Sequence, residues 1–338
     1  KTEKSDDEIF CEFRSLLEDA VKLRLVADVP LGAFLSGGMD SSVISAIMAK
    51  LFDIPLKTFT IGFSESLYDE RYCARDVSKI LGTCHFEKMV KPDDFTLLEK
   101  LLRNFGEPYC DASILPTYML SKFTREEVTV ALSGDGADEL FCGYYRYLLV
   151  KYANFADFLP LFARKTLAAS SSLLPSSRNE RTLAGKLKRI LSAFAETGEK
   201  RYYDIIVRFD EEVKKSVYGE RLKDCEFRST ADYFARLLEK GSSSDPVEKY
   251  SELDMNSYLH CDVLSKVDTA SMAASLEVRS PFLDYRIAEF AAGLPLRMKQ
   301  RGRKRKYLIE KAFCDILPRS VFSREKKERL LTFVWVFW

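Results

Sequence analysis

The chain has 338 residues, of which 46% are hydrophobic and 30% are charged, and its formal net charge is +1. A chain of this length can bury a sizeable core, as one large domain or two smaller ones. The near-zero net charge provides no strong field to attract nucleic acid or an anionic membrane, and two histidines are too few for a His-rich metal site.

The eight cysteines are spaced singly, and none forms a C-x-x-C pair. This spacing argues against a zinc knuckle or a dithiol redox motif, and a chain of this size does not need disulfides for its stability. We therefore expect reduced thiols and a cytoplasmic protein. The charged start KTEKSDDEIF predicts no signal peptide, and no apolar run approaches the ~18 residues of a membrane span.

The first half of the sequence alternates between helical and strand patterns. Apolar residues at helical spacing predict an amphipathic helix over 5–25, and short β-rich runs predict buried strands. In chain order, we then expect a strand over 29–35, a helix over 41–52, a strand over 56–63, a helix over 70–81, a strand over 85–89, helices over 97–104 and 115–123, and a strand over 128–132.

Strands that alternate with helices imply βαβ units and a parallel sheet. No further strand pattern follows Tyr144, and the runs at 170–179 and 241–246 are typical of loops. We therefore expect an α/β fold in which a parallel sheet over 1–150 precedes a mainly helical part over 151–338.

The run SGGMDSS at 36–42 lies between a predicted strand and a predicted helix. Paired glycines let the backbone approach an anion, the helix directs free N–H groups at the turn, and Ser36, Ser41 and Ser42 add hydroxyl donors. The run lacks the Gly-Lys-Ser/Thr ending of a Walker A loop. Asp40 suggests Mg²⁺ bridging to phosphates, because a carboxylate beside phosphate needs a cation between them. A simple helix cap, with Asp40 as capping acid, is the alternative.

A second glycine turn with acidic residues, SGDGADE at 133–139, follows another predicted strand. Alone it would be an ordinary turn. Both turns, however, follow the carboxyl ends of predicted strands, where ligands bind in open α/β sheets. Together they predict one site with two candidate metal ligands, Asp40 and Asp138.

These motifs make the sequence similar to a known family. SGGMDSS resembles the pyrophosphate-binding loop of the N-type ATP pyrophosphatases, and with SGDGADELFCGYYRY it resembles the synthetase domain of glutamine-hydrolysing asparagine synthetases. Further agreement comes from FTIGFSESLYDERYCARDV, LSKVDTASMAASLEVRSPFLD, RKYLIEKAF and LPRSVFSRE, so the resemblance runs from about Leu25 to about Arg324. It implies an ATP-pyrophosphatase core, like that of the adenine nucleotide α-hydrolases, followed by a helical part that completes the acceptor site.

The resemblance also implies which residues hold Mg·ATP. Asp40 and Asp138 would hold the metal ion. The residues implied for pyrophosphate are Ser36, Gly37, Gly38, Asp40, Ser41 and Ser42. The candidates for adenosine contact, largely through backbone, are Phe34, Leu35 and Ile61. Those lining the α-phosphate and the acceptor are Ser133, Gly134 and Asp135, and Asp135 is also a catalytic candidate.

The implied reaction has two steps, in which a carboxylate expels pyrophosphate from ATP and ammonia then displaces AMP from the acyl-adenylate. Lys306 matches the catalytic lysine position of the family and would stabilise the negative charge that develops. Without the resemblance, Lys306 would be one more surface charge in the basic run 301–306. Glu277 would assist proton transfer from the ammonium ion, and the alternative is a structural ion pair on a helix–loop junction.

The acceptor implied is the side chain of L-aspartate, but 111–117 departs from the aspartate-specific pattern. Three alternative functions therefore stay open: amidation of another carboxylate, a β-lactam-synthetase-like ring closure, and a non-catalytic scaffold. An RNA-modifying ATP pyrophosphatase would need a basic module that the near-zero charge does not supply.

No glutaminase half is recognisable, so we expect ammonia use or a separate glutaminase domain or subunit as partner. A homodimer is left open, and no nucleic-acid or membrane partner is expected.

Overall fold

A computed structural model describes most of the chain and divides it into two compact units. The first joins the described parts of Lys1–Phe141 and Ser257–Trp338, and the second lies within Cys142–Asn256. The last part of the chain thus returns to the first unit, which differs from the expected division at 150. The described residues are 4–64, 69–90, 95–107, 109, 111–170, 191, 198–207, 211–223, 225, 228–241 and 243–323.

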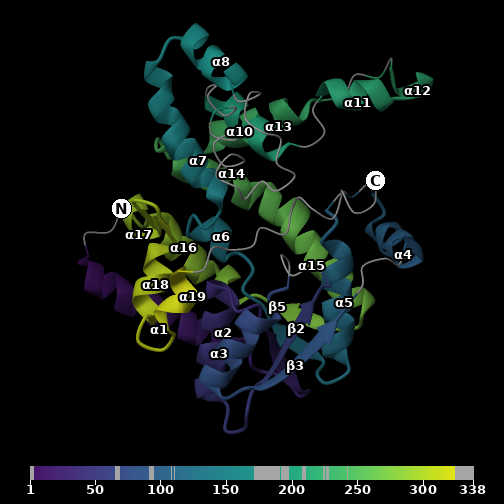
Figure 1. Cartoon of the computed structure of the whole chain (residues 1–338), viewed down its shortest axis with the longest axis vertical. Coiled ribbons are helices and arrows are strands. Elements are labelled where there is room, and N and C mark those ends of the chain that lie inside the picture. Colours follow the sequence, from purple (N-terminus) through teal and green to yellow (C-terminus); the bar gives the residue numbers. More distant parts are fainter. Residues whose placement is uncertain are drawn as a thin grey trace. The chain divides into compact units, whose positions relative to one another are not determined.

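A five-stranded sheet lies at the centre of the first unit (Figure 1). Its order is β3-β2-β1-β4-β5, and every neighbouring pair is parallel. The expected α/β class is confirmed, and the four strands predicted in the first half lie within a few residues of their expected positions. The strands are β1 (Leu31–Phe34), β2 (Lys57–Gly62), β3 (Cys84–Met89), β4 (Val130–Leu132) and β5 (Glu277–Arg279).

The expectation of no strand after Tyr144 is wrong. β5 extends the sheet beside β4, with Glu277 opposite Val130, and a separate hairpin pairs β6 (Gln300–Arg301) with β7 (Lys304–Arg305). β5 has only three residues, of which two are charged, so it lacks the apolar run that predicts a buried strand. Its conformation depends on backbone pairing with a strand that is more than 140 residues away in sequence.

The connections reverse direction at β1. The chain adds β2 and β3 on one side of β1, and then β4 and β5 on the other. Consequently, the loops that leave β1 and β4 start from adjacent strands at the same carboxyl edge. Such a switch point is where ligands bind in open α/β sheets. Both glycine turns from the sequence lie there, at residues 36–38 and 133–136.

Helices cover both faces of the sheet. α2 and α3 pack on one face, and α5 and α15 pack on the other, where Phe59 contacts Phe86 and Phe123 (Figure 1). The helices of this part are α1 (Asp6–Leu23), α2 (Met39–Leu51), α3 (Arg71–Leu81), α4 (Phe95–Phe105), α5 (Ile114–Arg125), α6 (Ala137–Leu140) and α15 (Ser265–Ala273). Ser5 caps the start of α1 and forms a capping box with Glu8.

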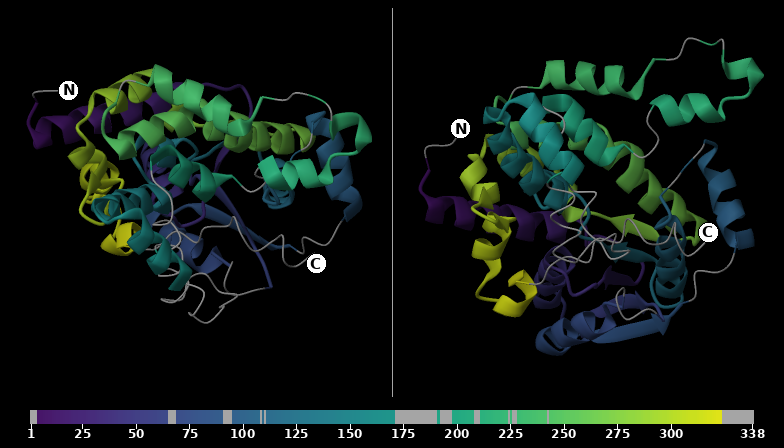
Figure 2. Two further views of the ribbon diagram at one scale, coloured as in Figure 1. Left: turned by 90° about the horizontal axis from the view of Figure 1, so that it is seen from above. Right: turned by 45° about the horizontal axis from the view of Figure 1, so that its top comes forward.

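The N-terminal helix α1 lies beside the C-terminal helices α16 and α18 (Figure 2). Phe13, on the buried face of α1, contacts Phe141, Phe290 and Phe313 from distant parts of the sequence. This aromatic packing holds α1 against the later helices of the first unit. The remaining elements of the unit are the single π-helical turn η3 (Leu259–Leu264), η4 (Pro281–Leu283), α16 (Tyr285–Gly293), α17 (Leu296–Lys299), α18 (Tyr307–Phe313) and α19 (Arg319–Ser323).

In the described residues, the second unit is helical, as expected. Its helices α7, α10 and α14 meet around the fully buried carboxylate of Asp254. Most of the predicted loop at 170–179 lies outside the described residues. None of the described helices of the chain has both the length and the apolar character needed to cross a bilayer. The elements are α7 (Tyr145–Asn154), η1 (Phe155–Phe158), α8 (Leu161–Ser170), α10 (Gly198–Ile206), α11 (Glu211–Val217), α12 (Glu220–Lys223), α13 (Thr230–Lys240) and α14 (Pro246–Asn256).

Candidate nucleotide site at the carboxyl edge of the sheet

The first glycine turn is a closed loop between β1 and the N-terminus of α2. The backbone N–H of Ser36 donates to Oγ of Ser41 at 3.2 Å, and that hydroxyl donates to the carbonyl of Gly38 at 3.3 Å. The N–H of Gly38 in turn donates to Oγ of Ser36 at 3.3 Å. These hydroxyls therefore fix the shape of the loop. The sequence predicts that Ser42 donates its hydroxyl to phosphate. Its side chain is instead fully buried in the first turn of α2.

Two glycines are required by close backbone contacts. Gly37 has a φ of +73°, and a Cβ there would lie 2.4 Å from the backbone carbon of Cys73 in α3. A Cβ at Gly134 would lie 2.7 Å from Cβ of Asp40 and 2.9 Å from the backbone nitrogen of Ser41. The second glycine turn therefore lies directly on the first, as the joint reading of the two motifs predicted.

Lys306 joins the two turns. Its Nζ donates to both carboxylate oxygens of Asp40, at 2.7 and 2.6 Å, and lies 2.6 Å from Oδ1 of Asp138. The side chains of Lys306, Asp40 and Asp138 are 7%, 15% and 9% exposed. The alternative of a surface charge is therefore excluded for Lys306. Lys306, Asp40 and Asp138 thus form a cluster at the switch point that is largely shielded from water, which we call the Lys306 cluster. Lys306 and Asp40 are 266 residues apart in the sequence.

The backbone around Lys306 is unusual. Lys306 precedes α18 in a left-handed conformation, with φ 53° and ψ 39°. Such a conformation costs a non-glycine residue of the order of 1–3 kcal/mol and persists where the surroundings enforce it. The hairpin just before it is anchored on both sides, since Lys304 pairs with Glu310 at 2.6 Å and Arg301 donates to the hydroxyl of Tyr307 at 2.7 Å. The hairpin and α18 thus direct Lys306 inward.

Asp135 lies in a short chain of hydrogen bonds across β4 and β5. Oγ of Ser133 donates to Oδ2 of Asp135 at 2.7 Å and is 2.9 Å from Oγ of Ser280. Because the hydroxyl proton of Ser133 points to Asp135, Ser280 is the donor to Ser133. Sequence reasoning missed Ser280, since the strand that positions it was not recognisable.

The adenosine candidates lie at the carboxyl ends of β1 and β2. Leu35 and Ile61 have almost fully buried side chains, and the N–H of Leu35 donates to the carbonyl of Phe59 at 2.9 Å. Phe34 packs against the Phe59 cluster. All three side chains therefore belong to the core, which leaves the backbone for the expected contact with adenosine.

Glu277 is not brought together with these residues. It begins β5, at the amino edge of the sheet, whereas both glycine turns lie at the carboxyl edge. Its side chain is 54% exposed and accepts a hydrogen bond from Nε of Arg279 at 2.6 Å. Arg279 also donates to the backbone carbonyls of Arg24 and Val26. This geometry favours the structural ion pair over a role in proton transfer.

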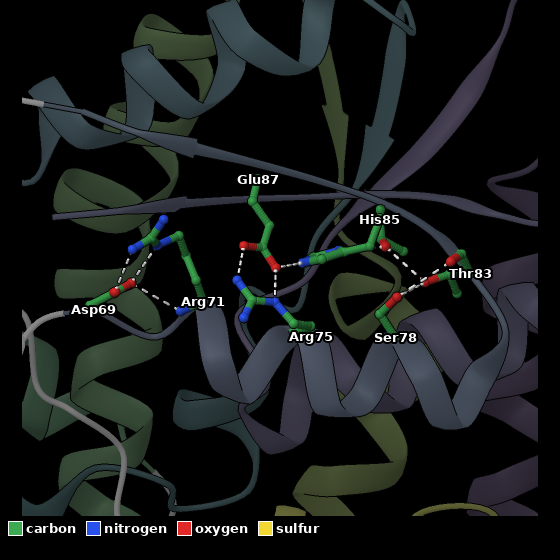
Figure 3. A network of polar contacts seen from close by, with 8 residues as sticks. Asp69, Arg71, Arg75, Ser78, Thr83, His85 and Glu87 are labelled. Atoms are coloured by element: carbon green, nitrogen blue, oxygen red, sulfur yellow. Dashed lines mark hydrogen bonds and ion pairs between the residues drawn. The ribbon is translucent and has the colours of Figure 1, made fainter.

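A separate polar network covers the β2–β3 side of the sheet (Figure 3). Nδ1 of His85 lies 2.9 Å from Oγ1 of Thr58, and Glu87 accepts two hydrogen bonds from Arg75 of α3. Burial lowers the pKa of His85, which keeps the ring neutral near pH 7. His85 is thus a packing residue between β2 and β3, and the Glu87–Arg75 pair ties α3 to the strand edge.

A further polar cluster lies before α5 and α15. Nζ of Lys266 donates to Oδ2 of Asp111 at 2.6 Å, and the hydroxyl of Tyr109 donates to Oδ1 of Asp262 at 2.7 Å. Burial alone would raise the pKa of Asp111, but Lys266 and Ser113 hold it below its usual value. Burial and the neighbouring Asp111 raise the pKa of Asp262. Lys266 of α15 thus pairs with a carboxylate that lies just before α5.

Comparison with known proteins agrees with this geometry. A family model described as asparagine synthase matches residues 12–335. The chain belongs to the asparagine synthase family. It is 33% identical over 95% of its length to asparagine synthetase [glutamine-hydrolyzing] 1 of Bacillus subtilis, and 32% identical over 96% to a putative asparagine synthetase of Mycobacterium tuberculosis. It is also 26% identical over 96% to amidase chyE of Penicillium rubens.

The chain spans about half the length of these family members, namely 49%, 48% and 52% respectively. The matched segment includes every residue of the Lys306 cluster and both glycine turns. The resemblance stated from the motifs is therefore confirmed at the level of the family.

The carboxylates of the cluster fit a divalent cation. Asp40 and Asp138 direct oxygens to one cationic nitrogen, so the two carboxylates converge on a common point. Carboxylate oxygens are the ligands that Mg²⁺ prefers, usually one or two of them together with substrate phosphates. Asp40 and Asp138 would hold the ion, which would supply positive charge beside the phosphates.

Proposed function

We propose that the chain is the synthetase part of an ATP-dependent amide ligase that adenylates a carboxylate. The observation that carries the proposal is the convergence of Lys306, Asp40 and Asp138 on one point at the switch point of the sheet. A phosphate cradle, two carboxylates for a cation and a buried ammonium group are the parts that a reaction at the α-phosphorus of Mg·ATP needs.

In the first step, a carboxylate oxygen attacks the α-phosphorus and the bond to pyrophosphate breaks. In the second, ammonia attacks the acyl carbon, AMP leaves with the bonding electrons, and the nitrogen loses a proton. We assign Lys306 to the charge on the phosphoryl oxygens and Asp135, within the second turn, to the acceptor side. The loop at 36–38 would lie beside the pyrophosphate portion, toward which the positive end of the α2 dipole points.

We propose the side chain of L-aspartate as the acceptor, because relatives that match nearly the whole chain are named asparagine synthetases. Amidase chyE, at lower identity, leaves other carboxylates and ring closure as alternatives. We propose ammonia from a separate glutaminase domain or subunit as the nitrogen source. A homodimer stays open, and the free thiols of the described cysteines support a reducing compartment such as the cytoplasm.

The test measures pyrophosphate release from Mg·ATP with L-aspartate and ammonium. Asp40→Asn keeps the shape of the side chain but removes its charge, so we expect release to fall by at least about 100-fold, as for lost transition-state electrostatics. Asp53→Asn, beyond the other end of α2, is the matched control and should retain full activity.

Release that does not depend on aspartate but does depend on another carboxylate would identify a different acceptor. If Mg·ATP binds neither to the wild type nor to Asp53→Asn, the chain is a scaffold and the proposed ligase activity is wrong.

A further inference from the structure

Lys306 occupies the position to which both candidate metal ligands point. Its Nζ lies within 2.7 Å of both oxygens of Asp40 and of one oxygen of Asp138. A Mg²⁺ ion needs oxygens at about 2.0–2.1 Å and nearly ideal geometry. A divalent ion placed at the point where these oxygens converge would coincide with Nζ, so one cation must displace the other there.

The cluster makes this displacement costly. All three side chains are at least 85% buried, so the ion pairs are little screened by water. Moving Nζ away would leave a buried ammonium group without a counter-ion unless another anion replaces the carboxylates. In the proposed reaction that anion is the phosphate of the nucleotide. The hairpin and α18 anchor the backbone of Lys306 on both sides. The ammonium group would therefore move from the carboxylates to the phosphate by rotation of the side chain, with the backbone in place.

We propose that Lys306 is an internal counter-ion that competes with the divalent cation for Asp40 and Asp138. The lysine releases the carboxylates when nucleotide phosphate offers it a new partner, so the protein binds metal and nucleotide together and binds metal alone only weakly. This inference rests on the proposed function, and it gives Lys306 a role in binding order in addition to its role in charge stabilisation.

The experiment measures the binding of Mn²⁺ alone by electron paramagnetic resonance, without nucleotide. Lys306→Met removes the competing charge and should tighten Mn²⁺ binding about 10-fold or more, within the 5–150-fold range typical of coupling between sites. Arg303→Met, at the exposed turn of the hairpin, removes a charge without touching either anchor and should bind Mn²⁺ as weakly as the wild type. Lys306→Gln is a second, polar variant in case the methionine variant fails to fold.

Thermal melting gives an independent readout. Mn²⁺ alone should raise the melting temperature of the Lys306 variants but not that of the wild type or Arg303→Met. Equal Mn²⁺ affinity in the wild type and a folded Lys306 variant would overturn the inference while leaving the proposed function intact. A failure of every protein to bind Mn²⁺, even with a non-hydrolysable ATP analogue, would instead reject the metal site and the proposed function with it.

Discussion

At the residue scale, the site depends on the absence of one side chain as much as on the charges. Gly134 brings the second turn so close to the first that a Cβ would lie within 3.0 Å of the backbone of Asp40 and Ser41. Real Cβ atoms do not approach backbone atoms at such distances, and a backbone cannot rotate aside as a long side chain can. The joint geometry of Asp40 and Asp138 therefore depends on this glycine.

Replacing Gly134 with alanine should push the two turns apart. We expect a loss of about 1–3 kcal/mol in the free energy of unfolding, as for other overpacked sites, and a larger relative loss of Mg·ATP affinity. Urea unfolding and equilibrium binding would measure the two effects. Gly293→Ala is the matched control, because a Cβ there meets nothing within 4 Å. Equal stability of the two variants would contradict the close contact.

At the element scale, a single carboxylate joins three helices of the second unit. Oδ2 of Asp254, on α14, accepts hydrogen bonds from Arg146 and Tyr147 of α7 and from Tyr202 of α10. Burial and the nearby carboxylate raise the pKa of Tyr202, so its hydroxyl stays protonated as a donor. In the sequence, these four residues show no motif that connects them.

Asp254→Asn should strongly destabilise the second unit. The amide keeps the shape but places an N–H₂ group among donors and removes the counter-ion of Arg146, so we expect a loss of about 3–5 kcal/mol. Hydrogen exchange should become faster in α7, α10 and α14. Asp245→Asn, at the start of the same helix, should be nearly neutral, because asparagine can also accept from the N–H of Val247. Unchanged exchange in α7 would exclude this role for Asp254.

At the scale of the first unit, the beginning and the end of the chain are joined by charge as well as by aromatic packing. Asp284 caps α16, receives two hydrogen bonds from the guanidinium of Arg286, and pairs at 3.0 Å with Arg24, which follows α1. Hydrogen bonds from Arg286 and Arg24 hold the pKa of Asp284 well below its usual range.

The depressed pKa predicts a dependence of stability on pH. The charged form of Asp284 contributes stability above the unfolded pKa of about 3.9, and this contribution is lost as the pH falls toward the lower pKa of the folded state. Asp284→Asn can still cap α16 but lacks the charge, so we expect it to cost about 1–3 kcal/mol at pH 7. The difference from the wild type should shrink below about pH 4. A difference independent of pH in thermal unfolding would contradict the assignment.

The sequence alone determined the features that depend on local pattern. Apolar residues at helical spacing placed the helices, and short β-rich runs placed the first four strands, because strands buried on both faces are apolar throughout. The glycine turns were recognisable because tight turns beside an anion need glycine at fixed positions. The family followed from the order of the motifs, and the comparisons confirm it.

Only the tertiary structure decided which distant residues meet. β5 forms because β4 offers a free edge, a fact that its own three residues do not encode. Local pattern could not distinguish Lys306, which is buried against two carboxylates, from its exposed neighbour Lys304 in the same basic run. Nor could it predict that Glu277 would lie at the opposite edge of the sheet. Electrostatic pairing and strand order depend on contacts between segments more than 100 residues apart, and periodicity carries no information about such contacts.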